Sequence, residues 1–252
     1  MRMFYLAAVA ASFATPVFAQ DMQEEAEQAE ADAVTVSGGT ALVSSYRFRG
    51  IDLSDEKVAV QGWVNVTHES GLYAGTWASG VDGFGELGGS NLELDLYAGY
   101  KTALADCVTL DGGLIYYAYP SSTGGNFEFF EPYAKLGLEA GPAALTLGVA
   151  YAPAQDVIRE NDNLYISADA GLPIEGTPFA LDAHVGRSEG KTTLTPGESY
   201  TDWSLGASAS WKALTARVAY VDTDISDFDA IAAGATTEIV DEAVVVSLTA
   251  AF

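Results

Sequence analysis

The sequence Leu-Glu-Leu-Asp-Leu-Tyr-Ala-Gly-Tyr-Lys at residues 92–101 alternates apolar with polar or small side chains. A period of two places Leu92 and Leu96 on one face of an extended chain and Glu93 and Asp95 on the other. A strand needs about ten residues to cross the hydrocarbon core of a bilayer when it is tilted. The stretch therefore predicts a two-faced strand of membrane-spanning length.

The same alternation recurs along the chain after residue 34, with turn residues between the segments. It is clear at residues 164–172 and at 179–186, where leucine, isoleucine, valine and alanine oppose polar residues and glycine. The pattern predicts about twelve strands, an even number that suits bacterial barrels. The predicted strands span residues 39–49, 58–67, 72–81, 92–101, 108–118, 127–138, 144–152, 163–172, 178–187, 200–211, 214–222 and 241–252.

The predicted connections fall into two classes that alternate along the chain. The shorter ones lie at residues 68–71, 102–107, 140–143, 173–177 and 212–213. The longer ones lie at residues 50–57, 82–91, 119–126, 153–162, 187–199 and 223–240. Short turns at one end and long loops at the other are typical of barrels in the bacterial outer membrane. The sequence thus predicts an all-β fold, an antiparallel up-and-down transmembrane β-barrel.

The beginning of the chain differs from the rest. Residues 1–19 have a basic start, an apolar run and a Val-Phe-Ala ending, which predicts a cleaved signal peptide. Residues 20–33 are acidic and lack glycine, and we expect them to form a periplasmic leader. Residues 34–252 are then the barrel, and the expected location is the bacterial outer membrane.

Composition excludes several functions. The chain has 11 Lys and Arg against 35 Asp and Glu, a net charge of −24, which disfavours nucleic-acid binding. A single cysteine, Cys107, rules out an intramolecular disulfide. Only His68 and His184 are available for a zinc cluster or a catalytic triad, and no motif pairs His184 with a serine. We therefore expect no catalytic residue, no metal and no cofactor.

Sequence blocks of interest lie at residues 41–50, 61–62, 68–78, 92–100, 116–120, 200–206 and 219–224, and so extend across nearly all of the chain after the leader. Together these blocks resemble the TorF-type porin family of proteobacteria. The resemblance implies an outer-membrane location and a porin role, and it brings no catalytic residues. The acidic leader and the loop at 223–240 depart from the family pattern.

The end of the chain also resembles outer-membrane barrels. Val244, Val246 and Leu248 alternate toward a terminal aromatic, Phe252. Such an ending is similar to the signal that the outer-membrane assembly machinery recognises, which implies that machinery as a partner. The outward face implies membrane lipid and lipopolysaccharide as further partners, while the sequence leaves the oligomeric state open.

If the apolar side chains face lipid, the opposite face lines the lumen, and most ionisable residues belong to it. The candidates for a lumen constriction are Arg47, Arg49, Arg217, Glu93, Asp95, Asp111, Glu131, Asp169, Asp182 and His184. The predicted strands place the three arginines on one stretch of wall and the acids across from it, which would orient dipolar solutes. The alternative is that these charges pair across a narrow lumen and fill it.

The function expected from these observations is a porin-like channel for passive diffusion of small hydrophilic solutes. The alternative is a closed structural or adhesion barrel of the outer membrane that transports nothing. Barrels of about eight strands are filled by side chains and those of about sixteen hold an aqueous channel, so twelve strands leave both open.

Overall fold

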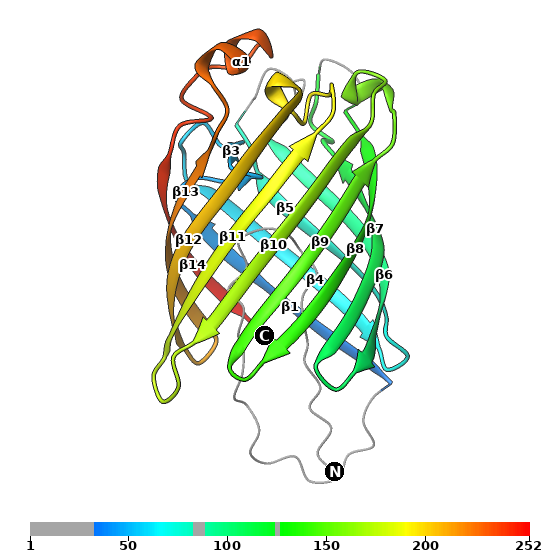
Figure 1. The fold of residues 1–252 in the computed structure, drawn as a ribbon, viewed down its shortest axis with the longest axis vertical. Coiled ribbons are helices and arrows are strands. Elements are labelled where there is room, and N and C mark those ends of the chain that lie inside the picture. Colours follow the sequence, from blue (N-terminus) through cyan, green and yellow to red (C-terminus); the bar gives the residue numbers. More distant parts are fainter. Residues whose placement is uncertain (1–32, 83–88, 124–126) are drawn as a thin grey trace.

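The computed structural model describes residues 33–82, 89–123 and 127–252, and twelve antiparallel strands of that part form a closed barrel (Figure 1). Successive strands pair, and β1 pairs with both β14 and β4, which closes the sheet. The strands are β1 (Val34–Val43), β4 (Ala59–His68), β5 (Leu72–Gly80), β6 (Leu92–Ala105), β7 (Val108–Ala118), β8 (Phe129–Ala140), β9 (Ala143–Ala152), β10 (Asn163–Pro173), β11 (Phe179–Glu189), β12 (Ser199–Trp211), β13 (Leu214–Thr223) and β14 (Ala243–Ala251). The predicted fold class is confirmed.

The two ends of the barrel differ as predicted. One end carries short turns and the C-terminus, and we call it the turn end (Figure 1). The other end, the loop end, carries the long connections with the short helices η2 (Asp156–Ile158), η3 (Pro196–Glu198) and α1 (Asp227–Ala232). Among the described residues, no helix has the length and apolar character needed to cross a membrane. The predicted signal peptide and nearly all of the predicted leader lie outside the described residues.

The two faces of the strands also follow the predicted alternation. Leu96, Ile166 and Leu205 point outward and are 50%, 54% and 66% exposed. Their inward neighbours in sequence, among them Asp95 and Tyr165, are buried. An apolar band of this extent is unfavourable in water and suits a lipid environment.

The first strand lies earlier in the chain than predicted. The prediction placed it at residues 39–49, whereas β1 spans Val34–Val43. Gly38 and Gly39 lie within β1 because the close approach of Trp63 and Phe252 leaves no room there for a larger side chain. At Ser44 the chain leaves the wall, so Arg47 and Arg49 do not belong to a barrel strand, and that part of the prediction is wrong.

The segment after β1 folds into the barrel as a small hairpin. β2 (Arg47–Phe48) pairs with β3 (Ile51–Asp52), and the two residues between them, Arg49 and Gly50, have φ of 48° and 82°. Two consecutive residues with positive φ make a type I′ turn, the tight connection preferred in two-residue hairpins. The alternation through Tyr46 and Phe48 therefore continues in a hairpin that lies inside the barrel (Figure 1).

Gly50 is required at this turn, which gives a first prediction. A Cβ at this position would lie 2.3 Å from Thr223 Cγ2, and φ is unfavourable for other residues. Gly50→Ala should lower the free energy of unfolding by about 1–3 kcal/mol through strain and overpacking. Thermal unfolding in detergent micelles measures this loss. Gly62→Ala on β4 is the control, because its Cβ would meet nothing closer than 3.6 Å. Equal stability of the two variants would contradict the prediction.

The apolar core lies inside the barrel, at the loop end. Its buried members come from the hairpin segment, from inward strand positions and from the loops. They include Tyr46, Ile51, Leu53, Trp77, Tyr117, Tyr119, Phe129, Ile158, Tyr200, Ala230, Ile239 and Val240. Backbone hydrogen bonds from Asp52 N to Ile239 O, at 2.8 Å, and from Asp82 N to Leu53 O, at 3.1 Å, join the hairpin segment to neighbouring loops. The hairpin segment is thus packed in place.

Candidate constriction in the barrel lumen

The hairpin tip crosses the lumen. It starts from β1, which lies between β14 and β4, yet Arg49 contacts residues of β8 and β10. In the closed strand order, these two strands stand on the far side of the barrel from β1. The hairpin formed by β2 and β3 therefore narrows the lumen at the loop end (Figure 1).

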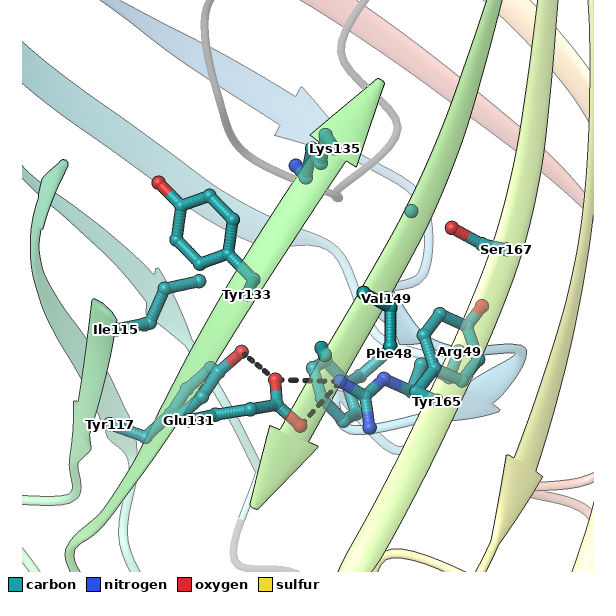
Figure 2. Close-up of a pocket in the computed structure, with 12 residues that line it drawn as sticks. Phe48, Arg49, Ile115, Tyr117, Glu131, Tyr133, Lys135, Val149, Tyr165 and Ser167 are labelled. Atoms are coloured by element: carbon teal, nitrogen blue, oxygen red, sulfur yellow. Dashed lines mark hydrogen bonds and ion pairs between the residues drawn. The ribbon is translucent and has the colours of Figure 1, made fainter. Parts of the chain in front are cut away.

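Arg49 makes several contacts with the far wall, and Figure 2 shows those with Glu131 and Tyr165. Its Nη2 donates to Glu131 Oε1 at 2.8 Å and Oε2 at 2.7 Å, and its Nη1 donates to Asn163 Oδ1 at 3.2 Å. The guanidinium carbon lies 4.1 Å from the Tyr165 ring centroid and 4.8 Å from that of Phe48. Charge-assisted hydrogen bonds and ring stacking both favour a planar cation here.

Arg49 remains charged despite its burial. Burial by itself lowers the pKa of the guanidinium, but the Glu131 carboxylate more than offsets this effect. The pKa of Arg49 is therefore raised above its ordinary value. The side chains of Arg49 and Glu131 are 7% and 2% exposed, so the two charges form a buried ion pair.

Arg47 stabilises the hairpin segment itself. Its Nη1 donates to the backbone oxygens of Asp241, at 2.9 Å, and Ile239, at 3.2 Å. Its Nη2 lies 3.8 Å from Asp52 Oδ2. The Asp52 carboxylate also accepts from Ser54 N at 2.7 Å and from Glu56 N at 2.7 Å. Arg47 therefore joins the hairpin to the loop before β14 and does not face an open lumen.

Two further carboxylates of the loop-end half are buried on β6. Glu93 Oε1 accepts a hydrogen bond from Tyr46 OH at 3.0 Å. Glu93 Oε2 and both carboxylate oxygens of Asp95 have no hydrogen-bond partner in the described part of the chain. Both side chains lie on the same inward face, and Asp95 pairs in register with Trp77 and Tyr117. Neither group forms an ion pair with a cation among the described residues, so both are buried without a counter-charge.

A second level of charges lies nearer the turn end. Arg217 on β13 donates to Asp182 on β11, with Nε 3.0 Å from Oδ1. His184 lies between Asp169, 2.6 Å from its Nδ1, and Asp202, 3.0 Å from its Nε2. These residues form paired groups along the wall from β10 to β13.

The remaining acid of this level lies on the other side of the barrel. Asp111 accepts from Tyr73 OH at 2.5 Å and pairs in register with Lys101 and Lys135. Both lysines point inward, on β6 and β8. Cations and acids thus alternate on this part of the wall.

The charges are not segregated into the two walls that the sequence predicted. Arg217 pairs with an acid two strands away, and Arg49 reaches the acid on the far wall. The reason is the early end of β1, which removes Arg47 and Arg49 from the wall and places them in the hairpin segment. The contact of Arg49 with Glu131 instead agrees with the alternative expectation, in which charges pair across the lumen.

Three contributors to the Arg49 site are absent from the set of candidate lumen residues. Tyr117, Asn163 and Tyr165 are neutral, whereas that set consists of ionisable residues. The alternation contains the missing signal, since Tyr165 shares its face with Asp169 and Tyr117 shares its face with Asp111. The same two-residue period therefore predicts that these side chains face the lumen.

The apolar exterior, the closed strand order and the charged interior define a β-barrel of porin-like architecture. The chain belongs to the family described as "Bacterial protein of unknown function (Gcw_chp)", whose profile matches residues 27–252. No curated protein sequence matches the chain.

Solved structures resemble the chain at low sequence identity. The NanC porin has 11% identity and a TM-score of 0.56, covering 86% of this chain and 99% of that one. OmpF of Salmonella typhi has 8% identity and a TM-score of 0.47, covering 87% and 97%. The outer-membrane protein opdK of Pseudomonas aeruginosa has 10% identity and a TM-score of 0.46, covering 89% and 68%. The NanC likeness establishes a shared fold, and the other two scores are too low to add to it.

Proposed function

We propose that this chain is an outer-membrane, porin-like channel for passive diffusion of small hydrophilic solutes. The observation that carries the proposal is the charged inner wall of a closed twelve-stranded barrel whose outer wall is apolar. Charged side chains on the inner wall suit an aqueous path, because rings of such charges select the ions that pass through a pore. The hairpin formed by β2 and β3 is the constriction of this path, and the solutes pass beside it.

The proposal includes the export and family details that the sequence predicts. Residues 1–19 direct export and are removed, and residues 20–33 form the periplasmic leader. The turn end then faces the periplasm and the loop end faces outward, with lipid and lipopolysaccharide around the barrel. A TorF-type porin role agrees with the sequence blocks that resemble that family.

The lumen charges predict weak selectivity for cations. Among the described residues, seven acids face the lumen, at Glu93, Asp95, Asp111, Glu131, Asp169, Asp182 and Asp202. The same part of the chain places five groups that can carry positive charge beside them, namely Arg49, Lys101, Lys135, Arg217 and His184, which lies between Asp169 and Asp202. A lumen with this excess of negative charge attracts cations and repels anions.

Single-channel recording tests the proposal. The mature chain is folded into micelles, its folding is checked by a heat-dependent shift in electrophoretic mobility, and it is added to planar bilayers. We expect discrete current steps with a reversal potential that favours cations in a salt gradient. Folded protein that gives no steps at any voltage would contradict the channel.

The second candidate is a closed structural barrel, and one observation favours it. The hairpin, the loops and the buried Arg49–Glu131 pair fill much of the loop end. This candidate predicts no current from the folded wild-type protein and weakened envelope integrity when the chain is absent. The recording described above separates the two candidates.

The C-terminal residue gives a prediction about assembly. Phe252 exchanges backbone hydrogen bonds with Gly38, at 2.9 and 3.0 Å, while its side chain is 81% exposed on the barrel surface. An exposed ring contributes little to the folded state, so we assign it to recognition by the assembly machinery. Phe252→Ala should lower the amount of folded barrel in the outer membrane several-fold, as measured by heat-shift electrophoresis of membrane fractions.

The control for this prediction is Trp211→Ala, another exposed aromatic at the turn end. Refolding of purified Phe252→Ala in micelles should equal that of the wild type, because the backbone contacts remain. A matching loss in both variants, or a loss of refolding in micelles, would contradict a role in recognition.

A further inference from the structure

Arg49 occupies a pocket of the wall that is shaped for its side-chain group. We propose that Glu131, Asn163 and Tyr165 form a binding site for guanidinium-bearing cations, and that Arg49 fills this site as an internal ligand. The inference deepens the proposed channel function and rests on it, because it names the class of solute that competes for the constriction. A solute that takes the place of Arg49 releases the hairpin tip and widens the lumen.

The site is held in shape by groups outside the hairpin. Tyr117 OH donates to Glu131 Oε2 at 3.2 Å, which orients the carboxylate. The amide nitrogen of Asn163 donates to Ser188 Oγ at 3.0 Å and to Glu189 O at 3.1 Å, which leaves its Oδ1 facing Arg49.

The Tyr165 ring is fixed in the same way. Its hydroxyl donates to Asp202 at 3.1 Å and lies 2.9 Å from His184 Nε2. None of these supports comes from the hairpin, so the carboxylate, the amide oxygen and the ring stay in position when Arg49 leaves.

The chemistry of the site selects a planar cation with several N–H donors. Glu131 takes two hydrogen bonds from one nitrogen, Asn163 takes one from another, and Tyr165 stacks on the plane at 4.1 Å. A guanidinium makes all three contacts at once. An ammonium group is not planar and cannot stack on the ring, and a quaternary amine has no N–H group to donate.

Space lies on both sides of the site. One cavity, of about 20 Å³, is lined by Arg49, Glu131, Tyr165 and Lys135 (Figure 2). A second, of about 80 Å³, lies among the loop-end residues, and Phe48 lines both. Arg49 thus borders one cavity, and its neighbour Phe48 borders both.

The position of Arg49 is conformationally unusual, which suits an exchangeable ligand. Its φ of 48° lies in the left-handed region, which non-glycine residues adopt infrequently. The contacts of the side chain on the far wall therefore hold the hairpin tip against an unfavourable backbone conformation. A free guanidinium forms the same contacts without that backbone requirement.

The experiment vacates the site and refills it. Arg49→Ala channels in a planar bilayer receive guanidinium chloride at low millimolar concentration, far below the molar range that unfolds proteins. We expect guanidinium to block the current, and tetramethylammonium, which has no N–H donor, to leave it unchanged. Adding Glu131→Gln to Arg49→Ala should weaken the block at least tenfold. Arg187→Ala, which alters an exposed arginine of β11, is the control and should show no new block.

A second readout does not require current. Guanidinium should raise the thermal unfolding temperature of Arg49→Ala in micelles, and not that of Arg49→Ala/Glu131→Gln. If Arg49→Ala does not fold, Arg49→Gln replaces it, because glutamine carries no positive charge and leaves Glu131 without a cation.

The two readouts separate this inference from the channel itself. A thermal shift without any current supports the cation site and contradicts the channel. Current without a guanidinium-specific block or shift contradicts the cation site and leaves the channel supported. An equal effect of guanidinium on the single and the double variant also overturns the inference.

Discussion

Replacing residues 46–53 with a Gly-Ser segment of equal length is expected to raise the single-channel conductance on the order of threefold, because twelve strands enclose more space than side chains alone fill. The replacement removes Arg49, Phe48 and Ile51, which occupy the lumen at the loop end. The barrel strands keep their hydrogen bonds, since β1 ends at Val43 and β4 begins at Ala59. Planar-bilayer recording measures the change directly.

A matched replacement controls for the flexible segment itself. Residues 174–177 form an exposed turn between β10 and β11, and a Gly-Ser segment there should leave the conductance unchanged. The hairpin is not the constriction if the conductance of the 46–53 variant equals that of the wild type. A rise in both variants would point to a general loosening of the barrel.

Glu131→Gln should be the most destabilising single substitution among the lumen acids. It leaves the Arg49 guanidinium in a buried site without its counter-charge, and breaking a buried pair in this way costs about 3–5 kcal/mol. Two hydrogen bonds to Arg49 and one from Tyr117 are weakened at the same time. Urea unfolding in micelles, followed by tyrosine and tryptophan fluorescence, measures the loss.

Glu139→Gln is the control, because Glu139 lies on the same strand but is exposed at the turn end. It should change the free energy of unfolding by less than about 0.5 kcal/mol, as surface substitutions usually do. When the hairpin is released from the far wall, the free energy of unfolding of Glu131→Gln falls by less. The single-channel current of that variant should then rise. Unchanged stability together with unchanged current would show that the Arg49–Glu131 pair does not hold the constriction.

Much of the fold was predictable from local pattern alone. The two-residue period fixed which side chains of β6, β10 and β11 face outward, because a strand has only two faces. The alternation of short and long connections indicated an up-and-down order, since antiparallel neighbours need only a tight turn. All ten candidate lumen residues were ionisable residues that this period and the predicted strands selected, Glu131 and Arg49 among them.

The end of β1 was not predictable from that pattern. Tyr46 and Phe48 continue the alternation beyond Val43, and a hairpin that packs inside a barrel has the same period as a strand in its wall. The two arrangements differ only in whether the side chains have room to pack inside the closed barrel, which the local sequence does not show. The loop-end core accepts Tyr46 as a buried residue, and Thr223 crowds Gly50 on the far side of the turn.

The sequence by itself determined most of the strands and the faces of their side chains, because these depend on neighbours along the chain. The pairing of Arg49 with Glu131, 82 residues away, and with Asn163, 114 residues away, was decided by the tertiary structure. These partners meet only after the sheet closes and the hairpin crosses it. Contacts that depend on closure leave no local periodicity, and so the constriction became visible only in the folded barrel.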